Sequence, residues 1–413
     1  MKLIDLRVNM SKQKRESGSV KVAEKNVVEL DDVVPSVFKE DIFDVFKIDG
    51  HITKKGFLAL LTTKGVLQGS PRISEAVANL ALFQDEEPLD AEQLYTAIRP
   101  NISYIEKILK GNVIVPDFQA LKASIAEIFE EVRSVKSGNV ASYIPQLKRV
   151  NPEKYGISVC TADGQQFHLG DAEEMYCVQS TCKPVNYCLA LEELGEGEVH
   201  NHVGREPSGA SFNALTLNSK GLPHNPMINA GAIMSCSLIK PNLFLSDRFD
   251  FILDRWRALG GQSPVGFNNS VYLSEKRTAD RNFALGYFMR EKNAFPDNVN
   301  LQETLDFYFQ CCSIELSAST HAVVAATLAN SGVCPITGEK VLKESTVKDC
   351  LSLMYSCGMY DFSGEWAFSV GLPAKSGVSG ALIIVIPNVM GISIWSPRLD
   401  ELGNSVRGIE IAR

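Results

Sequence analysis

The sequence predicts an α+β fold in which an antiparallel sheet is gathered from two distant parts of the chain. Residues 155–171 alternate around Ala162–Asp163–Gly164, which is typical of a β-hairpin with an Asp-Gly turn. The apolar run at 380–395 is interrupted by Pro387–Asn388 and indicates two buried strands joined by a turn. Helical patterns dominate between 180 and 361, so strands at the two ends of this region are expected to pair.

The overall composition is that of a soluble globular protein. Its 413 residues are enough for two or three domains, and 45% are hydrophobic while 22% are charged. The formal net charge of −8 and the pI near 5.5 argue against nucleic acid or an anionic membrane surface as the main partner. The run at 380–395 is also too short to span a membrane.

The cysteine and histidine patterns indicate neither a disulfide scaffold nor a metal site. The ten cysteines include no C-x-x-C pair, and a chain of this size does not need disulfides, so buried reduced thiols are expected. The six histidines offer only His200 and His202 as a close pair, without a cysteine or acidic pattern to complete a ligand set. We therefore expect no bound metal.

Two segments precede the main part of the chain. Residues 1–29 are polar and basic, and are expected to be either a disordered tail or the remnant of an organelle-targeting segment. Asp5, Glu16 and Glu24 weaken the targeting interpretation, and no apolar signal-peptide core is present. From 30 to 112 apolar residues recur at spacings of three and four, among others over 34–46 and as one pattern over 90–111, which predicts a small helical domain.

Residues 46–58 within this domain resemble half of an EF-hand. Gly50 and Ile52 occupy its turn positions, but Val45 and Lys47 cannot coordinate calcium and Gly56 replaces the closing glutamate. We therefore expect an EF-hand-like domain without calcium ligands. A break at 111–118 separates it from a helix at about 118–135 and from the predicted catalytic domain, 113–413.

A Ser-x-x-Lys spacing occurs four times, at Ser11–Lys14, Ser180–Lys183, Ser237–Lys240 and Ser345–Lys348, so the spacing alone identifies nothing. Only the second copy is followed directly by a proline that opens a helix, Pro184. Proline has no N–H and belongs in the first turn of a helix, which here is expected to end at Gly195. Ser180 would then lie at the helix entrance, where free N–H groups can stabilise an oxyanion, with Lys183 one turn further on the same face.

A lysine can activate a serine only if its amine is neutral. This requires its pKa to fall from about 10.4 to about 7–8, through burial or a second cation. Lys375 of "PAKSGVSG" is a candidate for that cation, and K-S-G after S-x-x-K is the pattern of serine β-lactamases and penicillin-binding proteins. Lys136–Ser137–Gly138 repeats the tripeptide, but only the copy at 375 opens an apolar strand. From these residues alone, Ser180 is either a nucleophile or an ordinary helix start.

From about 139 to its end the chain resembles the glutaminases of the serine-dependent β-lactamase-like superfamily, specifically the animal kidney/liver type. The resemblance is carried by long blocks, among them "VQSTCKP", "EPSGASFNAL", "HNPMINAGAI", "DRNFALGY", "SCGMYDFSGEWAF" and "GLPAKSGVSG". It implies a β-lactamase/penicillin-binding-protein-like catalytic domain that hydrolyses L-glutamine to L-glutamate and ammonia without a cofactor. Residues 30–112 fit the N-terminal domain of that family more loosely, and no 33-residue ankyrin period is found.

The resemblance also implies roles for individual residues. Ser180 would be the acylated nucleophile and Lys183 its base, and Tyr360 would exchange protons with Lys183 and the leaving ammonia. Tyr308 would support this site, and the backbone N–H of Val378 would join that of Ser180 in an oxyanion hole. The further substrate-binding positions that it implies are Tyr143, Gln179, Asn229, Glu275 and Asn282.

Three of these positions have plainer interpretations that stay open. Asn229 could be a turn residue, Glu275 a surface charge and Tyr308 a core aromatic. Chemically, Glu275 suits the ammonium of free glutamine, whose carboxylate would need amide or hydroxyl donors.

The sequence departs from the family in the segment that corresponds to its gating loop, near the tetramer interface. Phe212 is kept, but Ala214 stands where the kidney type has a lysine, Thr216 where it has an aromatic residue, and Phe288 in place of a tyrosine. We expect catalysis to be kept and the response to phosphate and to loop-directed inhibitors to be altered.

The resemblance implies L-glutamine as substrate, inorganic phosphate as an activator, a homotetramer that can form filaments, and the mitochondrial matrix as the compartment, with the cytoplasm as the alternative. Two rival functions stay open at this point. One is another serine acyl-transfer enzyme of the same fold, either a β-lactamase or a D-Ala peptidase. The other is a catalytically inactive scaffold.

Overall fold

The computed structural model describes residues 52–211 and 213–413. Its first part is a helical unit with a core of its own, which includes Phe57, Leu61, Leu80 and Ile105. The unit contains α3 (Lys54–Thr63), α4 (Ser74–Leu80), α5 (Ala91–Ile98), α6 (Ile102–Leu109) and the short antiparallel pair β1 (Ile52–Thr53) and β2 (Pro88–Leu89). The helical patterns predicted after residue 52 are thus confirmed, whereas the one at 34–46 lies outside the described residues.

Local signals explain where these helices begin and end. Asp90 and Gln93 form a capping box at the start of α5, and Thr53 caps α3 by accepting a hydrogen bond from the N–H of Gly56. Pro100 divides what the sequence pattern suggests as one helix into α5 and α6. The EF-hand likeness is not confirmed. Gly50 lies outside the described residues, and within 52–413 no group of three or more His, Cys, Asp or Glu side chains could hold a metal ion.

The main sheet has five strands in the order β4-β3-β10-β9-β8, and every neighbouring pair is antiparallel. Its hairpin at 156–170 pairs with the strands that follow residue 380, so the predicted pairing of the two distant parts is confirmed. The register places Gly156 opposite Trp395 and Thr161 opposite Met390. The strands are β3 (Gly156–Thr161), β4 (Gln166–Gly170), β8 (Ala374–Ser376), β9 (Ala381–Ile386) and β10 (Met390–Trp395).

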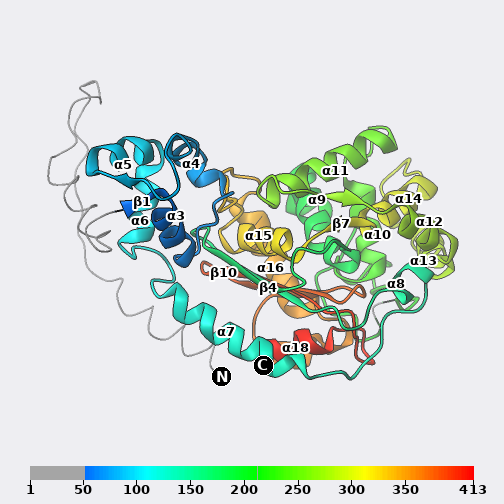
Figure 1. The fold of residues 1–413 in the computed structure, drawn as a ribbon. Helices are drawn as coiled ribbons and strands as arrows, with labels where there is room; N and C mark the ends of the chain where they lie inside the picture. The colour runs from blue at the N-terminus through cyan, green and yellow to red at the C-terminus, as the bar shows by residue number, and fades with distance from the viewer. Residues whose placement is uncertain (1–51, 212) are drawn as a thin grey trace, which may run out of the picture.

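Helices cover both faces of this sheet, as Figure 1 shows, with α15 (Ala318–Ala329) on one side and α7 (Phe118–Arg133) with α18 (Val406–Ala412) on the other. Alternate residues of β9 therefore belong to different cores: Ile383 faces α15, and Leu382 faces α7 and α18. The alanine-rich α15 approaches so closely that a Cβ on Gly391 would lie 2.2 Å from the backbone nitrogen of Ala326. Gly391 on β10 and the alanines of α15 thus permit the close packing of this helix on the sheet.

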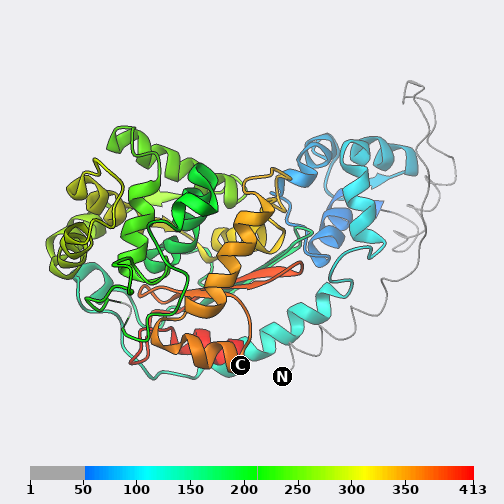
Figure 2. The ribbon, with the colours of Figure 1, turned by 180° about the vertical axis from the view of Figure 1, so that it is seen from behind.

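A larger helical region completes the molecule (Figure 2). α9 runs over Cys182–Val199, but Gly195 has φ of +80° and ends its first, longer section as the sequence predicts. A three-stranded sheet in the order β5-β7-β6 was not predicted, because strands of two or three residues show no periodicity. The elements are α8 (Pro145–Lys148), α10 (Asn229–Leu238), α11 (Leu245–Leu259), α12 (Asn269–Arg277), α13 (Asp280–Glu291), α14 (Leu301–Cys312), α16 (Glu344–Cys357), α17 (Ser363–Ser369), β5 (Tyr176–Cys177), β6 (Gly266–Phe267) and β7 (Ile314–Leu316).

The helical unit rests on the turn between β3 and β4. The buried carboxylate of Asp163 accepts hydrogen bonds from Lys107 and from the N–H of Ile114, the latter at 2.5 Å. The N–H of Gln166 donates to the carbonyl of Gly65 at 2.6 Å. All ten cysteines are buried and unpaired, as predicted. None of the helices described over 52–413 is both long and apolar enough to cross a membrane.

Candidate active site

Ser180 lies in a single 3₁₀ turn, η3 (Gln179–Thr181), that leads directly into α9. Pro184 is the third residue of α9, in the first turn where the sequence predicts it. Ser180 Oγ and Lys183 Nζ are in hydrogen-bond contact at 2.5 Å. Ser180 is 8% exposed and Lys183 is fully buried. The sequence therefore folds locally into a buried Ser–Lys pair at a helix entrance.

The other Ser-x-x-Lys copies lack this arrangement. Ser237 donates to the carbonyl of Met234, and Lys240 forms an ion pair with Glu193 at 2.6 Å. The side chain of Lys348 is 75% exposed, and the copy at 11–14 lies outside the described residues. Of the copies described, the 180–183 pair alone buries its lysine against its serine.

Burial lowers the pKa of Lys183, because the neutral amine loses less on leaving water than the ammonium does. The nearby thiols of Cys312 and Cys182 oppose this shift. A second buried lysine lies close by: Lys375, on β8, donates to the carbonyls of Gly358 at 3.0 Å and Ser376 at 2.8 Å. Burial, reinforced by the charge of Lys183, holds the pKa of Lys375 well below its usual range. Lys375 thus lies where the sequence predicts a second cation, but burial favours its neutral form, and burial is what lowers the pKa of Lys183.

Two tyrosines flank the pair. Tyr308, on α14, donates its phenol to Asn229 Oδ1 at 3.4 Å, and its ring centre lies 6.0 Å from Lys183 Nζ. Tyr360, which begins η4 (Tyr360–Phe362), lies beside Ser180, whose hydroxyl opposes the rise that burial causes in the pKa of its phenol, and its ring centre lies 4.5 Å from Lys375 Nζ. Burial raises the pKa of both phenols, so each remains a proton donor at neutral pH.

A buried carboxylate stands beside Ser180. Glu275, 8% exposed on α12, accepts hydrogen bonds at Oε1 from the phenol of Tyr143 at 2.6 Å and from Gln179 Nε2 at 2.9 Å. Burial raises the pKa of Glu275, whereas these two bonds and the charge of Lys183 act against the rise. Tyr143 is 49% exposed although its phenol faces Glu275, so this side of the cluster borders solvent. The position of Glu275 does not fit the surface-charge interpretation.

Asn229, the first residue of α10, joins the remaining predicted positions. Its Oδ1 accepts from Lys183 Nζ at 3.0 Å and from Tyr308, and its Nδ2 donates to Asn282 Oδ1 at 3.3 Å. These hydrogen bonds place both Asn229 and Tyr308 in the network around Lys183. The amide thereby connects the Ser–Lys pair to α13.

Val378 follows the K-S-G tripeptide in the turn between β8 and β9. Gly377 packs directly on the serine turn, since a Cβ there would lie 2.9 Å from the carbonyl of Val178 and 3.2 Å from Thr181. The side chain of Val378 packs in the same small cluster as Ile144. The structure therefore brings all ten predicted site residues into one region built from segments between 143 and 378.

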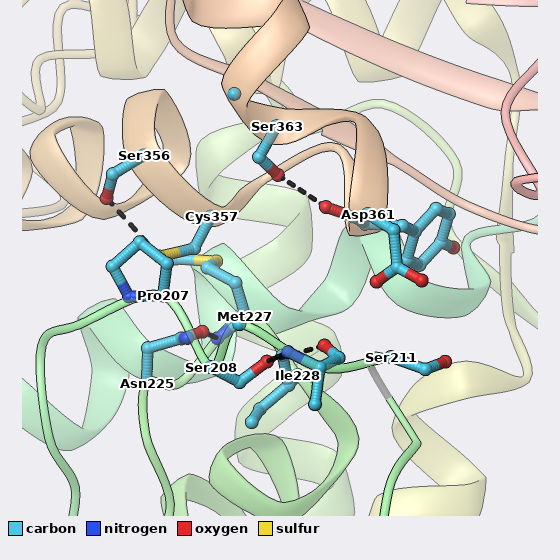
Figure 3. Close-up of a pocket in the computed structure, with 14 residues that line it drawn as sticks. Pro207, Ser208, Ser211, Asn225, Met227, Ile228, Ser356, Cys357, Asp361 and Ser363 are labelled. Atoms are coloured by element: carbon cyan, nitrogen blue, oxygen red, sulfur yellow. Dashed lines mark hydrogen bonds between the residues drawn. The ribbon is translucent and has the colours of Figure 1, made fainter.

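A cavity of about 510 Å³ opens beside Tyr360 (Figure 3). Pro207 and Ser208 line one side, while Cys357 and Ser363 line the other. Apart from its place in the "GMYDFSG" block, nothing in the sequence indicates Ser363 as a site residue, because its contact with Tyr360 depends on the backbone of this loop.

Of the residues that depart from the kidney type, Ala214 and Thr216 follow the cavity-lining residues 207–211, and Phe288 lies on α13. The N–H of Ala214 donates to the carbonyl of Ser211, and the N–H of Thr216 to the carbonyl of Ala214, both at 2.9 Å. On α13 the Phe288 ring centre lies 5.7 Å from Lys292 Nζ. Phe212 lies outside the described residues.

The fold and the Ser–Lys pair define the class of serine-dependent β-lactamase-like proteins. The family model described as "Glutaminase" matches residues 138–413, and the chain belongs to this family. It is 49% identical over 385 residues to "Putative glutaminase 3" of Caenorhabditis elegans, covering 91% of this chain and 66% of that protein. It is 44% identical over 361 residues to "Glutaminase liver isoform, mitochondrial" of Rattus norvegicus, covering 86% of this chain and 60% of that protein. The chain thus spans less than two thirds of the length of these animal relatives.

Bacterial relatives and solved structures agree with this assignment. The chain is 45% identical over 288 residues to "Glutaminase" of Nostoc sp., covering 70% of this chain and 85% of that protein. The solved structure of "Probable glutaminase ybaS" superposes with a TM-score of 0.69 at 35% identity, covering 72% of this chain and 95% of that one. The structure "Mglu in its glutamate form" superposes with a TM-score of 0.67 at 36% identity, covering 70% and 66% respectively.

Proposed function

We propose that the protein hydrolyses L-glutamine to L-glutamate and ammonia through a γ-glutamyl ester on Ser180. The observation that carries this proposal is the 2.5 Å contact between Ser180 Oγ and the fully buried Lys183, beside the buried carboxylate of Glu275. A serine is a weak nucleophile until a neighbouring base removes its proton, and a buried lysine with a lowered pKa supplies that base.

In the acylation step, neutral Lys183 takes the Ser180 proton as Oγ attacks the side-chain amide carbon. The negative charge that develops on the amide oxygen is stabilised by the backbone N–H groups of Ser180 and Val378. The proximity of Gly377 to the serine turn supports the assignment of Val378. Tyr360, which lies beside Ser180, passes a proton to the leaving nitrogen and recovers it from Lys183. The C–N bond breaks, and ammonia leaves an ester on Ser180.

In the deacylation step, water attacks the ester carbon while the Lys183–Tyr360 pair removes its proton. The ester C–O bond breaks, Ser180 regains its proton and glutamate is released. Tyr308 keeps Lys183 oriented through their shared partner Asn229, which supports its role. Every group used in this route belongs to the chain itself.

The substrate's amino-acid end distinguishes this reaction from other serine acyl transfers. We assign its ammonium to Glu275, whose carboxylate is held by Tyr143 and Gln179. Its carboxylate is assigned to the amides of Asn229 and Asn282, which are hydrogen-bonded to each other in the substrate-free protein. A β-lactam or a D-Ala-D-Ala peptide presents no free ammonium at this position, so Glu275 favours free glutamine.

Assembly, regulation and location extend the proposal beyond the site. We propose a homotetramer able to form filaments, with inorganic phosphate as activator and an altered response because Ala214, Thr216 and Phe288 depart from the kidney type. The relatives from rat and mouse are named mitochondrial, which supports the mitochondrial matrix as its location. The domain organisation we propose is a tail at 1–29, a helical domain at 30–112 and a catalytic domain at 113–413.

An assay of ammonia release from L-glutamine tests the proposal directly. The wild type should turn over and Ser180→Ala should lose nearly all activity, while Ser237→Ala, from a Ser-x-x-Lys copy without the buried pair, should keep it. A chromogenic β-lactam serves as the competing substrate. Turnover of the β-lactam but not of glutamine favours the related acyl-transfer enzyme, and no turnover of either by the wild type favours a scaffold.

A further inference from the structure

Tyr360 has a backbone conformation that tyrosine rarely adopts. Its φ of +55° lies in the left-handed region, where the Cβ of an L-residue is crowded by the backbone. The residue is also buried, with its phenol close enough to Ser180 for that hydroxyl to affect its pKa, and with Lys375 Nζ over its ring. Such a conformation persists only where the surrounding structure holds it.

The hydroxyl of Ser363 contacts the backbone on both sides of Tyr360. It accepts a hydrogen bond from the N–H of Met359 at 3.0 Å and donates one to the carbonyl of Tyr360 at 2.7 Å. Figure 3 shows Ser363 on the wall of the cavity with the second of these bonds drawn. Both the donor and an acceptor position of the hydroxyl are engaged in these bonds, so the rotation of its proton is fixed.

The residues just before Tyr360 are anchored to the main sheet. The carbonyl of Gly358 accepts from Lys375 Nζ and from the N–H of Ser376, and Asn404 Nδ2 donates to the carbonyl of Met359 at 3.5 Å. A Cβ on Gly358 would lie 1.8 Å from the carbonyl oxygen of Ala374, so the loop lies directly against β8. Ser363 extends this anchoring by one residue, from the carbonyl of Met359 to that of Tyr360.

We infer that Ser363 is a positioning residue, whose hydroxyl holds Tyr360 in its left-handed conformation and so aims the phenol at Ser180. The inference rests on the proposed function, in which Tyr360 transfers protons during both steps. The amino-acid end of the substrate is assigned to Glu275 and to the Asn229–Asn282 amides, whereas the hydrogen bonds of Ser363 go to Met359 and Tyr360. Loss of the Ser363 hydroxyl should therefore slow the chemical steps and leave substrate binding nearly unchanged.

The first test is steady-state kinetics of Ser363→Ala with glutamine. Because a displacement of about 1 Å at a reacting group costs about 100-fold, we expect kcat to fall about 10- to 100-fold. KM should stay within about twofold, since uniform binding is not affected. Ser363→Thr should restore kcat, because it keeps the hydroxyl and the adjacent cavity accommodates its methyl group. The matched control is Ser369→Ala, an exposed serine of the same helix whose hydroxyl donates to the carbonyl of Glu365, and its kcat should match the wild type.

The second test asks whether Ser363 acts through Tyr360. Tyr360→Phe should lower kcat, and adding Ser363→Ala to it should cause no further loss, since the phenol being aimed is already absent. Independent, multiplying losses from the two substitutions would overturn the inference. Ser363→Cys keeps the size of the side chain but hydrogen-bonds weakly, so it should lose activity at a melting temperature near the wild-type value. Wild-type kcat in Ser363→Cys and Ser363→Ala would likewise overturn the inference.

These outcomes separate the inference from the proposed function. A wild-type protein that releases no ammonia from glutamine rejects the proposed function itself. An active wild type in which Tyr360→Phe has full activity rejects the role assigned to Tyr360 and, with it, the positioning role. An active wild type that loses kcat in Tyr360→Phe but not in the Ser363 variants rejects the positioning role alone.

Discussion

Replacing Glu275 by glutamine isolates the charge of the carboxylate from its geometry. Both hydrogen bonds to Glu275, from Tyr143 and from Gln179, end on the same oxygen, Oε1. A glutamine can present its own Oε1 to both donors and place its NH₂ where Oε2 stood. Glu275→Gln is therefore expected to keep the local structure and remove only the counter-charge for the ammonium of the substrate.

The size of the effect follows from the burial of this group. A hydrogen bond to a charged partner contributes about 1.5–3 kcal/mol, and Glu275 is only 8% exposed, so the interaction is little weakened by water. At about 1.4 kcal/mol per decade, kcat/KM for glutamine should fall about 10- to 100-fold. Most of the fall should lie in KM, because the ammonium is bound equally in the ground state and the transition state.

The stability of Glu275→Gln should not fall with its activity. Burial raises the pKa of Glu275, so at neutral pH the folded protein holds an ionised carboxylate less favourably than the unfolded chain does. The amide carries no such penalty. The melting temperature of substrate-free Glu275→Gln, measured by calorimetry near pH 7, should therefore equal or exceed that of the wild type.

A substrate without the ammonium provides the decisive comparison. The wild type and Glu275→Gln should hydrolyse glutaramate, the desamino analogue of glutamine, with similar kcat/KM. Asp306→Asn is the matched control. Asp306 forms a more exposed ion pair with Lys276, the neighbour of Glu275 on α12, so losing this carboxylate should leave kcat/KM for both substrates unchanged. Equal losses for glutamine and glutaramate in Glu275→Gln would refute the assignment of the ammonium to this carboxylate.

Three further predictions follow from the same geometry. The active form of Lys183 is neutral, and burial lowers its pKa, so kcat/KM should rise as the pH increases through that pKa. If the chemical step limits the rate, a kcat/KM that stays flat from about pH 6 to 9 would contradict the role of Lys183 as base. The charge of Lys183 contributes to the low pKa of Lys375, whereas burial alone lowers that of Lys183, so Lys375→Met should leave the rising limb of the pH–kcat/KM profile at its wild-type pH, and a limb moved to higher pH would show that Lys375 is charged beside Lys183. Gly377→Ala, whose Cβ would lie 2.9 Å from the carbonyl of Val178, should displace the serine turn and lower kcat by about 100-fold, with an unaltered kcat as the contrary result.

The main sheet could be predicted because its strands carry their own signals. An Asp-Gly turn between alternating residues marks β3 and β4, and the Pro387–Asn388 break divides an apolar run into β9 and β10. The small β5-β7-β6 sheet could not be predicted, because pairs such as Tyr176–Leu316 depend on the packing of the helices around them. Pro100 was the signal for the break between α5 and α6, and its effect was missed there.

Some features of the site could likewise be predicted from the sequence, and others could not. The entrance of α9 follows from Pro184, which fixes the position of Ser180 relative to the helix. The meeting of Glu275 with Tyr143 and Gln179 joins α12 to segments about 100 residues or more away in sequence, and no spacing within one element indicates it. Only the resemblance to a family brought these residues together before the structure did. The left-handed conformation of Tyr360 had no signal at all, because neither glycine nor asparagine marks it.

The pairing of β3 with β10 also determines when the site can assemble during synthesis. The strands that contain Gly156 and Trp395 can pair only after Trp395 has been synthesised. The helical unit that precedes them is built from local contacts and can fold earlier. Until β3 and β10 have paired, the K-S-G strand has no sheet to join, and Gly377 is not held against the turn that contains Ser180. The nascent chain is thus expected to carry Ser180 without being able to use it until the strands at 374–395 have been synthesised.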